Sequence, residues 1–135
     1  MPDFLKQAKE INSKNPYSIY NNIEVAKAER DFAELYLDIE EKFLNLYGTL
    51  HGGVYFLLAD CCVGCAARTD GKSHVTQQAS VSYIRPVKSG RVTATANVVH
   101  RGHTTSIIDV SIMDEKKRLL FKGTFTDFCV KDSIS

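Results

Sequence analysis

The stretch from Gly48 to Ala67, GTLHGGVYFLLADCCVGCAA, constrains the fold of this chain more than any other part of the sequence. From Val54 onward, every residue of the stretch except Asp60 is apolar or small. The run is too long for a strand and too short to span a bilayer, so it predicts a buried helix. The rest of the chain is expected to pack around that helix.

Asp60 is the one charged residue of the predicted helix. A carboxylate removed from water without a partner costs several kcal/mol as an order of magnitude, so a buried Asp60 is expected to be paired or used in chemistry. Its neighbours at helical spacing offer no solvated face; they are Phe56, Leu57 and Gly64. The alternative is that Asp60 caps a loop or lies on an exposed strip of the helix.

The start of the predicted helix is marked by His51, Gly52 and Gly53. The first amides of a helix have no intrahelical acceptor, and they carry a partial positive charge. Two adjacent glycines leave these amides bare, so they can hold an anion or polarise the carbonyl oxygen of a ligand that approaches closely. The alternative is a flexible turn that only begins the helix.

His51 and Asp60 lie at opposite phases of the predicted helix. Their nine-residue separation corresponds to about 900° of rotation and about 13 Å of rise along an unbroken helix. The two residues therefore cannot converge on one small ligand within one chain. If both serve one site, the site combines the helix start of one subunit with Asp60 of another, which predicts a symmetric dimer.

Length and charge limit the class of protein. A chain of 135 residues suits one domain with a sizeable core, so residues 1–135 are expected to form a single domain. The net charge of +1 gives no electrostatic footprint for nucleic acid. The charged N-terminal segment MPDFLKQAKE lacks the apolar core of a signal peptide, and no other segment suits a membrane span. We therefore expect a cytoplasmic protein without a nucleic-acid or membrane partner.

The four cysteines are expected to be reduced thiols in that compartment. Cys61 and Cys65 share a helical face while Cys62 points elsewhere, and no second ligand pair follows at the spacing of a zinc site. Free cysteine also packs well as a small buried residue, and Cys129 is interpreted in the same way. No metal site is predicted. A catalytic cysteine is compatible with the spacing, but no nearby His or Asn is placed to activate it.

Alternating apolar and polar residues predict strands on both sides of the helix. A helical pattern covers residues 3–13 within a lead-in of residues 1–19, and residues 40–50 form a connection without a period of its own. The expected strands are residues 23–29, 33–39, 75–83, 92–98, 106–113 and 119–130, with a hairpin turn at Arg30 and Asp31. A largely antiparallel sheet of about six strands would wrap around one long helix and bury it, giving an α+β fold.

The motifs also resemble a known family. Its pattern N-x-x-G-x-x-H-G-G, with an acid nine residues after the histidine, is formed by Asn45, Gly48, His51, Gly52, Gly53 and Asp60. Together with Y-I-R-P at Tyr83–Pro86 and R-G-H-T at Arg101–Thr104, this pattern resembles the hot-dog-fold acyl-CoA thioesterases. The match is to the phenylacetyl-CoA thioesterase type, which includes the thioesterase-superfamily-member-2 group, and it covers roughly residues 20 to 130. It implies a single hot-dog domain.

The resemblance also implies catalytic roles. The acid at the position of Asp60 acts as general base on water or as nucleophile, facing the helix start of the partner subunit. The amide of Gly52 donates to the thioester oxygen, and Asn45 matches a residue that fixes the thioester or water. Thr76 falls where some members carry a serine that holds the water, and His51 is expected to position the loop or substrate. The alternatives for Asn45 and Thr76 are a loop-capping Asn and an ordinary strand Thr.

Coenzyme A carries several phosphates, so basic groups are expected near the mouth of the acyl tunnel. The resemblance places the turn at Arg101–Thr104 there, with His103 where lysine or arginine is common. The substrate-binding candidates are Gly53, Arg85, Arg101, Gly102, His103 and Thr104.

The activity implied is hydrolysis of an acyl-CoA to a carboxylic acid and coenzyme A, without a metal or redox cofactor. The expected assembly is a homodimer or a dimer of dimers (a homotetramer) with shared active sites. Two alternatives stay open. One is a non-catalytic acyl-CoA sensor, which keeps the tunnel but needs no carboxylate. The other is an acyl-thioester hydratase or dehydratase, which needs a His and an acid together at one site.

Overall fold

The computed structural model describes residues 2–131, and one antiparallel sheet dominates it. The sheet has six strands in the order β1-β2-β4-β5-β6-β3. The strands are β1 (Glu24–Glu29), β2 (Phe32–Asp38), β3 (Ser73–Tyr83), β4 (Arg91–Arg101), β5 (Thr105–Met113) and β6 (Leu119–Lys131). Each predicted strand is present, and its ends lie within about two residues of the expected positions, except that β4 continues further toward Arg101.

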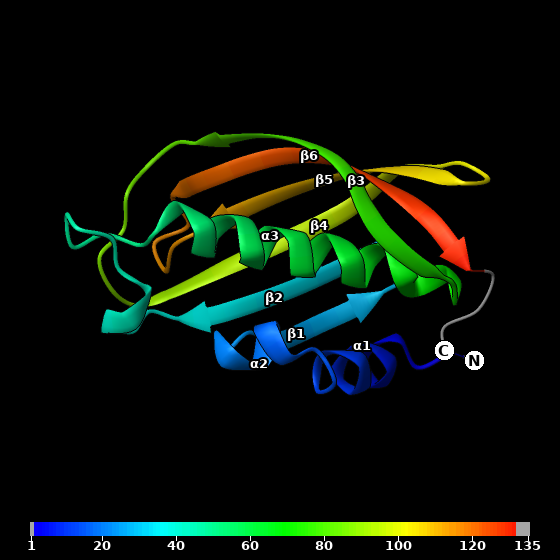
Figure 1. Ribbon diagram of the computed structural model, residues 1–135, viewed down its shortest axis with the longest axis horizontal. Coiled ribbons are helices and arrows are strands. Elements are labelled where there is room, and N and C mark those ends of the chain that lie inside the picture. Colours follow the sequence, from blue (N-terminus) through cyan, green and yellow to red (C-terminus); the bar gives the residue numbers. More distant parts are fainter. Residues whose placement is uncertain (1, 132–135) are drawn as a thin grey trace.

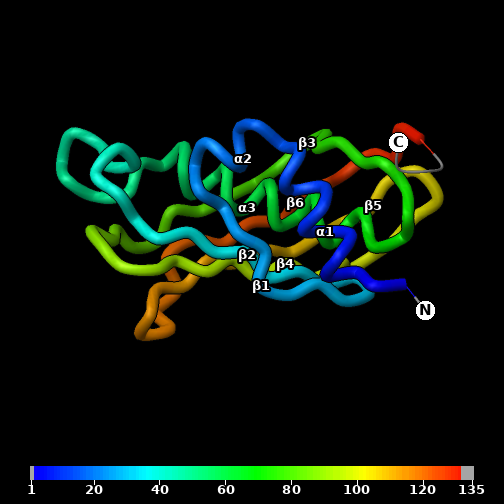
Figure 2. Tube along the Cα trace, turned by 90° about the horizontal axis from the view of Figure 1, so that it is seen from below, coloured from blue at the N-terminus to red at the C-terminus, as the bar shows by residue number. Residues whose placement is uncertain are grey.

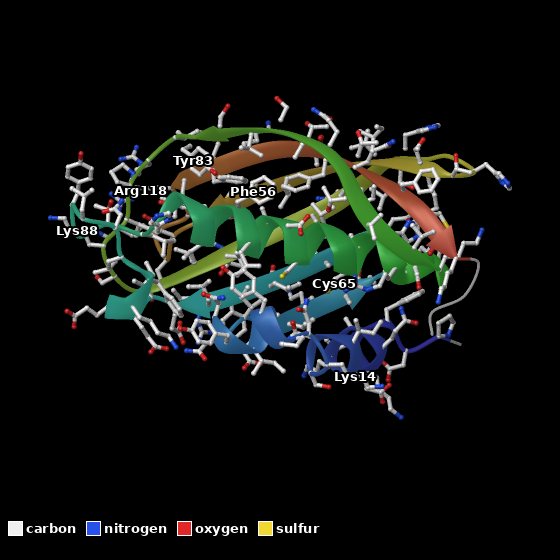
Figure 3. All side chains as sticks on the ribbon, viewed as in Figure 1. Lys14, Phe56, Cys65, Tyr83, Lys88 and Arg118 are labelled. Carbon is white, nitrogen blue, oxygen red and sulfur yellow. The ribbon has the colours of Figure 1, made fainter. Side chains whose placement is uncertain are left out.

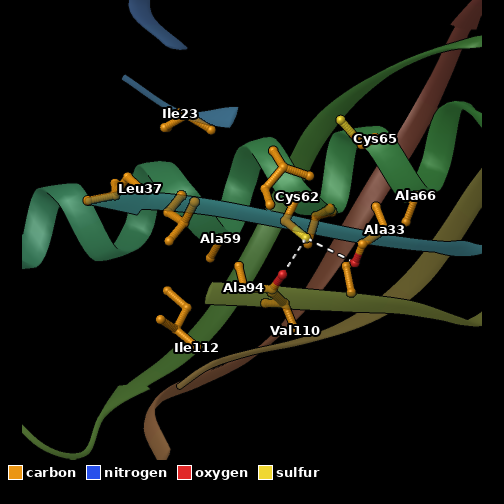
Figure 4. Close-up of a cluster of buried hydrophobic side chains, with 14 of the residues drawn as sticks. Ile23, Ala33, Leu37, Ala59, Cys62, Cys65, Ala66, Ala94, Val110 and Ile112 are labelled. Carbon is orange, nitrogen blue, oxygen red and sulfur yellow. Dashed lines mark hydrogen bonds between the residues drawn. The ribbon is translucent and has the colours of Figure 1, made fainter. Parts of the chain in front are cut away.

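The long helix α3 (Gly52–Ala67) lies along the concave face of the sheet, which curves around it (Figure 1). It packs against β2, β4 and β5 through fully buried side chains that include Leu58, Ala59 and Val63. Small residues let the helix approach the sheet closely: the Cys62 thiol lies 3.3 Å from the carbonyl oxygen of Ala33 and 3.4 Å from that of Ala94 (Figure 4). The predicted central helix is therefore confirmed.

Two short helices precede the sheet, and the first of them packs against its outer strand β1 (Figure 2). Helix α1 (Phe4–Asn12) confirms the predicted N-terminal helix, and its start is capped by Asp3, which accepts from the Lys6 amide at 3.0 Å. Helix α2 (Pro16–Tyr20) was not predicted. It is a single turn begun by a proline at its first position, which is too short to show a helical period.

The connection before α3 also has structure that its sequence did not reveal. Residues Glu41–Phe43 form the short 3-10 helix η1, and Phe43 is buried in the core. A second 3-10 turn, η2 (Arg68–Asp70), follows α3. The predicted β1–β2 hairpin turn is confirmed, with Asp31 in the left-handed region at φ 62°.

The result is the architecture of a hot-dog fold, a sheet wrapped around one central helix. Strand β3 ends the sheet on one side, so its outer edge has no strand partner within residues 2–131. No helix in that range is both long and apolar enough to cross a membrane.

Candidate active site

The start of α3 presents one free backbone donor. His51 is the residue before the helix, and its Nδ1 accepts a hydrogen bond from the Gly53 amide at 2.8 Å. The expectation that both glycine amides are bare is therefore wrong, because the imidazole itself caps the second one. The Gly52 N–H has no hydrogen-bond partner among the described residues, and it carries the positive end of the helix dipole.

The loop that leads into this helix is built by Asn45. Its Oδ1 accepts from the amides of Tyr47 at 2.9 Å and Thr49 at 3.1 Å, which forms an Asx turn. Gly48 adopts φ 76°, in the left-handed region that favours glycine. The loop-capping interpretation of Asn45 is thus confirmed, while a contact with substrate stays a prediction.

A hollow of about 310 Å³ opens beside the free amide and is lined by Asn45, Gly52, Tyr83 and Arg85, among others. Its floor is Tyr55, whose hydroxyl donates to the carbonyl oxygen of Arg85 at 2.8 Å. Burial raises the pKa of Tyr55 to about 12, so this phenol stays neutral. Figure 3 shows Tyr83 on β3 above the first turns of α3. We call this hollow the helix-start hollow.

Asp60 lies on the outward strip of α3 and is only half-buried in the single chain. The prediction of a carboxylate sealed inside the core is therefore wrong, and the exposed-strip alternative is correct for one chain. The strip is apolar, since Phe56, Leu57 and Gly64 flank Asp60 and are themselves half-exposed. The Thr76 hydroxyl on β3 donates a hydrogen bond to Asp60 Oδ1, so the structure brings these two predicted residues together.

A second acid, Asp127, lies next to this pair and was not predicted. Asp127 on β6 is the register partner of Thr76 and is only 1 % exposed. Burial, and then the nearby Asp60 charge, raise the pKa of Asp127 to about 6. The sequence did contain a signal, because Asp127 continues the inward-facing alternation of Phe121, Gly123 and Phe125 and so places a charge on the core face.

Asp60, Thr76 and Asp127 share a hollow of about 280 Å³ with Arg68 and His74, which we call the carboxylate hollow. Within residues 2–131, three buried side-chain polar atoms lack a hydrogen-bond partner, and all belong to residues that line it: Arg68 Nε, His74 Nδ1 and Asp127 Oδ1. Unpaired buried polar groups are rare in folded proteins and indicate bound water or a functional role.

The two hollows are separate within one chain. They share no lining residue, and Asp60 follows Gly52 by eight positions, or about 12 Å along α3. The free amide and the carboxylate therefore do not face one ligand in a single chain.

Arg101, in the turn after β4, was predicted to contact a coenzyme A phosphate, but its guanidinium is occupied by protein acceptors. Each guanidinium nitrogen has a protein acceptor: Asp31 Oδ1 at 2.7 Å from Nη2 and 3.0 Å from Nε, and Asp70 Oδ2 at 2.9 Å from Nη1. Arg101 also binds the last carbonyls of α3, so it closes the fold and has no free donor to aim at a phosphate.

The other residues of this turn lie at the surface. His103 and Thr104 are exposed, and they line a hollow of about 400 Å³ with Gly102, Arg30 and Lys72. Gly102 is required by the turn, because a Cβ there would lie 2.6 Å from the Thr105 carbonyl oxygen. Arg85 lines the helix-start hollow instead, so the substrate-binding candidates do not share one surface of a single chain.

The three thiols of α3, Cys61, Cys62 and Cys65, are protonated at neutral pH. Burial, followed by the Asp60 charge, raises the pKa of Cys61 to about 12, and burial raises the pKa values of Cys62 and Cys65 as well. Because the thiolate is the nucleophile, these groups are inert in the arrangement shown.

Comparison with known proteins gives a consistent set of similarities. A family model described as the thioesterase superfamily matches residues 47–121. The acyl-coenzyme A thioesterase PaaI of Escherichia coli is 30 % identical over 121 residues, which cover 82 % of this chain and 86 % of that protein.

Two solved structures extend the similarity to the whole fold. A hypothetical thioesterase from Streptococcus pneumoniae, solved with coenzyme A, is 29 % identical with a TM-score of 0.86, covering 92 % of this chain and 99 % of that one. A Streptococcus mutans protein bound to acetyl CoA is 30 % identical with a TM-score of 0.81, covering 85 % of this chain and 94 % of that one.

Proposed function

The chain belongs to the thioesterase superfamily and is a thioester hydrolase, and from this premise we propose that it cleaves acyl-CoA to a carboxylic acid and coenzyme A. The observation that carries the proposal is the Thr76–Asp60 hydrogen bond on the open strip of α3, with a free helix-start amide on the same helix. The similar proteins include an acyl-coenzyme A thioesterase and structures holding coenzyme A or acetyl CoA, which supports this substrate class.

In the proposed reaction, Asp60 is the acting carboxylate. The Thr76 hydroxyl holds one oxygen of Asp60 in place, which leaves the other oxygen to take a proton from water or to attack the thioester carbon. Water attack forms a C–O bond as the C–S bond breaks, and the proton taken by Asp60 then passes to the leaving thiolate.

The Gly52 amide is the proposed donor to the thioester oxygen. Negative charge develops on that oxygen in the transition state, and a fixed donor at a helix start stabilises it without reorganisation. His51 contributes by fixing this end of the helix through its bond to Gly53. That bond occupies Nδ1 and leaves Nε2 for any proton transfer, so the match to a thioesterase family model is what favours the hydrolase over the hydratase alternative. The proposed step uses a carboxylate, a hydroxyl, an amide and water, so no cofactor is invoked.

We place the complete site between two subunits of a homodimer. The two halves lie about 12 Å apart and in separate hollows of one chain, so a partner has to supply the missing half. Strand β3, which contacts Asp60 through Thr76, has an unpaired outer edge, and the outward strip of α3 is apolar, so both features favour burial against a second copy.

The coenzyme A phosphates are assigned to the hollow at the β4–β5 turn. With Arg101 held by two carboxylates, the basic groups able to meet a phosphate there are Arg30, Lys72 and His103. The Arg30 side chain is 58 % exposed and pairs only loosely with Asp31 at 3.5 Å. Phosphate binding by this surface is the proposed role of the turn.

The test is release of coenzyme A from short-chain, medium-chain, long-chain and aromatic acyl-CoA by the wild type and by Asp60→Asn. Detection is chromatographic, because the partly exposed Cys129 thiol would react with a thiol dye. We expect the variant to fold normally and to lose at least about 100-fold in kcat, the scale for removal of a positioned acid or base. Turnover near the wild-type value in Asp60→Asn would remove Asp60 from the mechanism.

The sensor alternative has its own outcome in this experiment. A folded wild type that binds acyl-CoA in a direct binding assay, yet releases no coenzyme A from any of the four classes, would be a binding protein. That result would overturn the proposed hydrolysis while leaving the proposed binding surface intact.

A further inference from the structure

The Thr76 hydroxyl lies between two carboxylates. It donates a hydrogen bond to Asp60 Oδ1, and Thr76 is the cross-strand partner of Asp127, with which it lines the carboxylate hollow. A hydroxyl has a single proton to donate, although its oxygen can accept as well. Both carboxylates can therefore bond to Thr76 only if one of them carries its own proton and donates it to the hydroxyl oxygen.

Burial decides which acid carries that proton. Asp127 is 1 % exposed, and its Oδ1 has no hydrogen-bond partner within residues 2–131, whereas Asp60 is half-buried on the open strip of α3. Removal from water disfavours the charged form of a carboxyl, so the proton belongs on Asp127. The raised pKa of Asp127, about 6, agrees with this assignment.

The charges around Asp127 come from helix α3, the turn η2 and strand β3. Helix α3 and the turn after it present Asp60, which favours the neutral acid, and Arg68, which favours the ionised acid. Strand β3 presents His74, which also favours the ionised acid, and the residue opposite on β5 is the uncharged Ser106. The other titratable lining residues are Cys61 and Cys65, whose raised pKa values keep them neutral.

This inference rests on the proposed function of Asp60. We propose that Asp127 is a positioning residue: its protonated carboxyl donates to the Thr76 oxygen, and the Thr76 hydroxyl in turn donates to Asp60. The chain of donors points in one direction and holds the ionised base in one orientation. When Asp127 ionises, it competes for the Thr76 proton and places a second negative charge beside Asp60, so the base loses its fixed donor.

The matched variants are Asp127→Asn and Asp127→Ala. The side-chain amide introduced by Asp127→Asn is neutral and has N–H donors at every pH, so it imitates the protonated acid, whereas alanine supplies no donor. We expect Asp127→Ala to lower kcat roughly 10-fold with little change in KM, by analogy with the loss of about 10- to 100-fold when a residue that orients a metal ligand is removed. Asp127→Asn should restore most of that loss.

The pH profile separates this role from a merely structural one. In the wild type, kcat should pass through a titration near pH 6 above which it is reduced, because Asp127 is then ionised. Asp127→Asn should lack that decline. A folded Asp127→Ala with the wild-type kcat and profile would overturn the proposal, and so would an Asp127→Asn variant no better than Asp127→Ala.

The route through Thr76 is tested by a double-mutant cycle. If Asp127 acts only through the hydroxyl, Asp127→Ala should add almost no loss of kcat in a Thr76→Val background. Additive losses would show that Asp127 acts by another path.

A measurement without substrate keeps this inference distinct from the proposed function. Carbon-13 NMR titration of the aspartate carboxyls should show the Asp127 midpoint moving to lower pH in Asp60→Asn, because the like charge is removed. An Asp127 midpoint that does not move in Asp60→Asn would show that the two acids are not coupled. A wild type that hydrolyses no acyl-CoA would overturn the proposed function, while this titration would still report on the hydrogen-bond chain.

Discussion

At the residue scale, the buried Asp127 carboxyl makes the stability of the fold depend on pH. Its pKa is raised from 3.8 to about 6, so between these values the unfolded chain has released a proton that the folded chain still holds. Stability therefore falls as pH rises from about 4 to about 6 and stays lower above that window. The total loss is on the order of 2–3 kcal/mol.

Asp127→Asn should remove this loss, because the amide is neutral at every pH. We expect the variant to be more stable than the wild type by roughly 2 kcal/mol at about pH 7.5 and nearly equal to it at about pH 4. Urea unfolding at both pH values measures the difference. An advantage of the same size at both pH values would mean that shape, rather than ionisation, controls the effect.

Arg101 and Arg30 form a second residue-scale test, because they line the same hollow with different roles. Arg101→Met leaves the half-buried Asp70 and the α3 carbonyls without their donor, so we expect a loss of about 2–3 kcal/mol in urea unfolding. Arg30→Ala removes an exposed group and should change stability by less than about 0.5 kcal/mol.

For catalysis we expect the reverse order: Arg30→Ala should change the kinetic constants more than Arg101→Met does. Arg30→Ala is expected to raise KM for acyl-CoA severalfold without changing kcat, and its effect should shrink at high salt, because a surface charge is screened. A raised KM in Arg101→Met at a temperature where the variant is fully folded would return Arg101 to the phosphate-binding role.

At the element scale, the first residue of α3 allows the backbone donor to be removed alone. Proline is tolerated at this position, where the N–H has no helical partner, and His51 already has the extended backbone, φ −63° and ψ 138°, that precedes proline. Gly52→Pro should therefore fold and lower kcat by about 100- to 1,000-fold, the scale for losing one oxyanion donor.

Gly52→Ala is the matched control, because it keeps the amide. Its Cβ would lie 3.4 Å from the Tyr83 ring, an ordinary contact, so most activity should be kept. Circular dichroism and thermal unfolding check that both variants fold. Equal losses in the two variants would assign the effect to crowding of the hollow instead of the missing N–H.

The helices and strands differ in how far the sequence predicted them. Helix α3 is a long apolar run and the strands alternate apolar and polar residues, so the type of each element and its order along the chain followed from the residues alone. The prediction that Asp60 is buried was wrong, because an apolar strip on the outward face of a helix has the same sequence pattern as one that faces a core. Arg101 was misplaced because its carboxylate partners, Asp31 and Asp70, lie 70 and 31 residues away, a separation that no local pattern reports.

At the scale of the whole molecule, the fold leaves each chain with two half-sites. Both hollows lie along α3. The rise of the helix between Gly52 and Asp60 keeps the helix-start hollow apart from the carboxylate hollow. In the proposed homodimer the helix start of one copy meets Asp60 of the other, so catalysis is expected to depend on the assembly.

Mixed subunits test that assembly directly. An Asp60→Asn chain has an intact helix start, and a Gly52→Pro chain has an intact carboxylate, so a heterodimer of the two contains one complete site and one doubly defective site. Random mixing makes half of the dimers mixed, so we expect about a quarter of the wild-type activity from two nearly inactive parents. Mass spectrometry of intact dimers counts the hybrids. Hybrids present at the expected fraction with no gain over the parents would overturn the site shared between two chains.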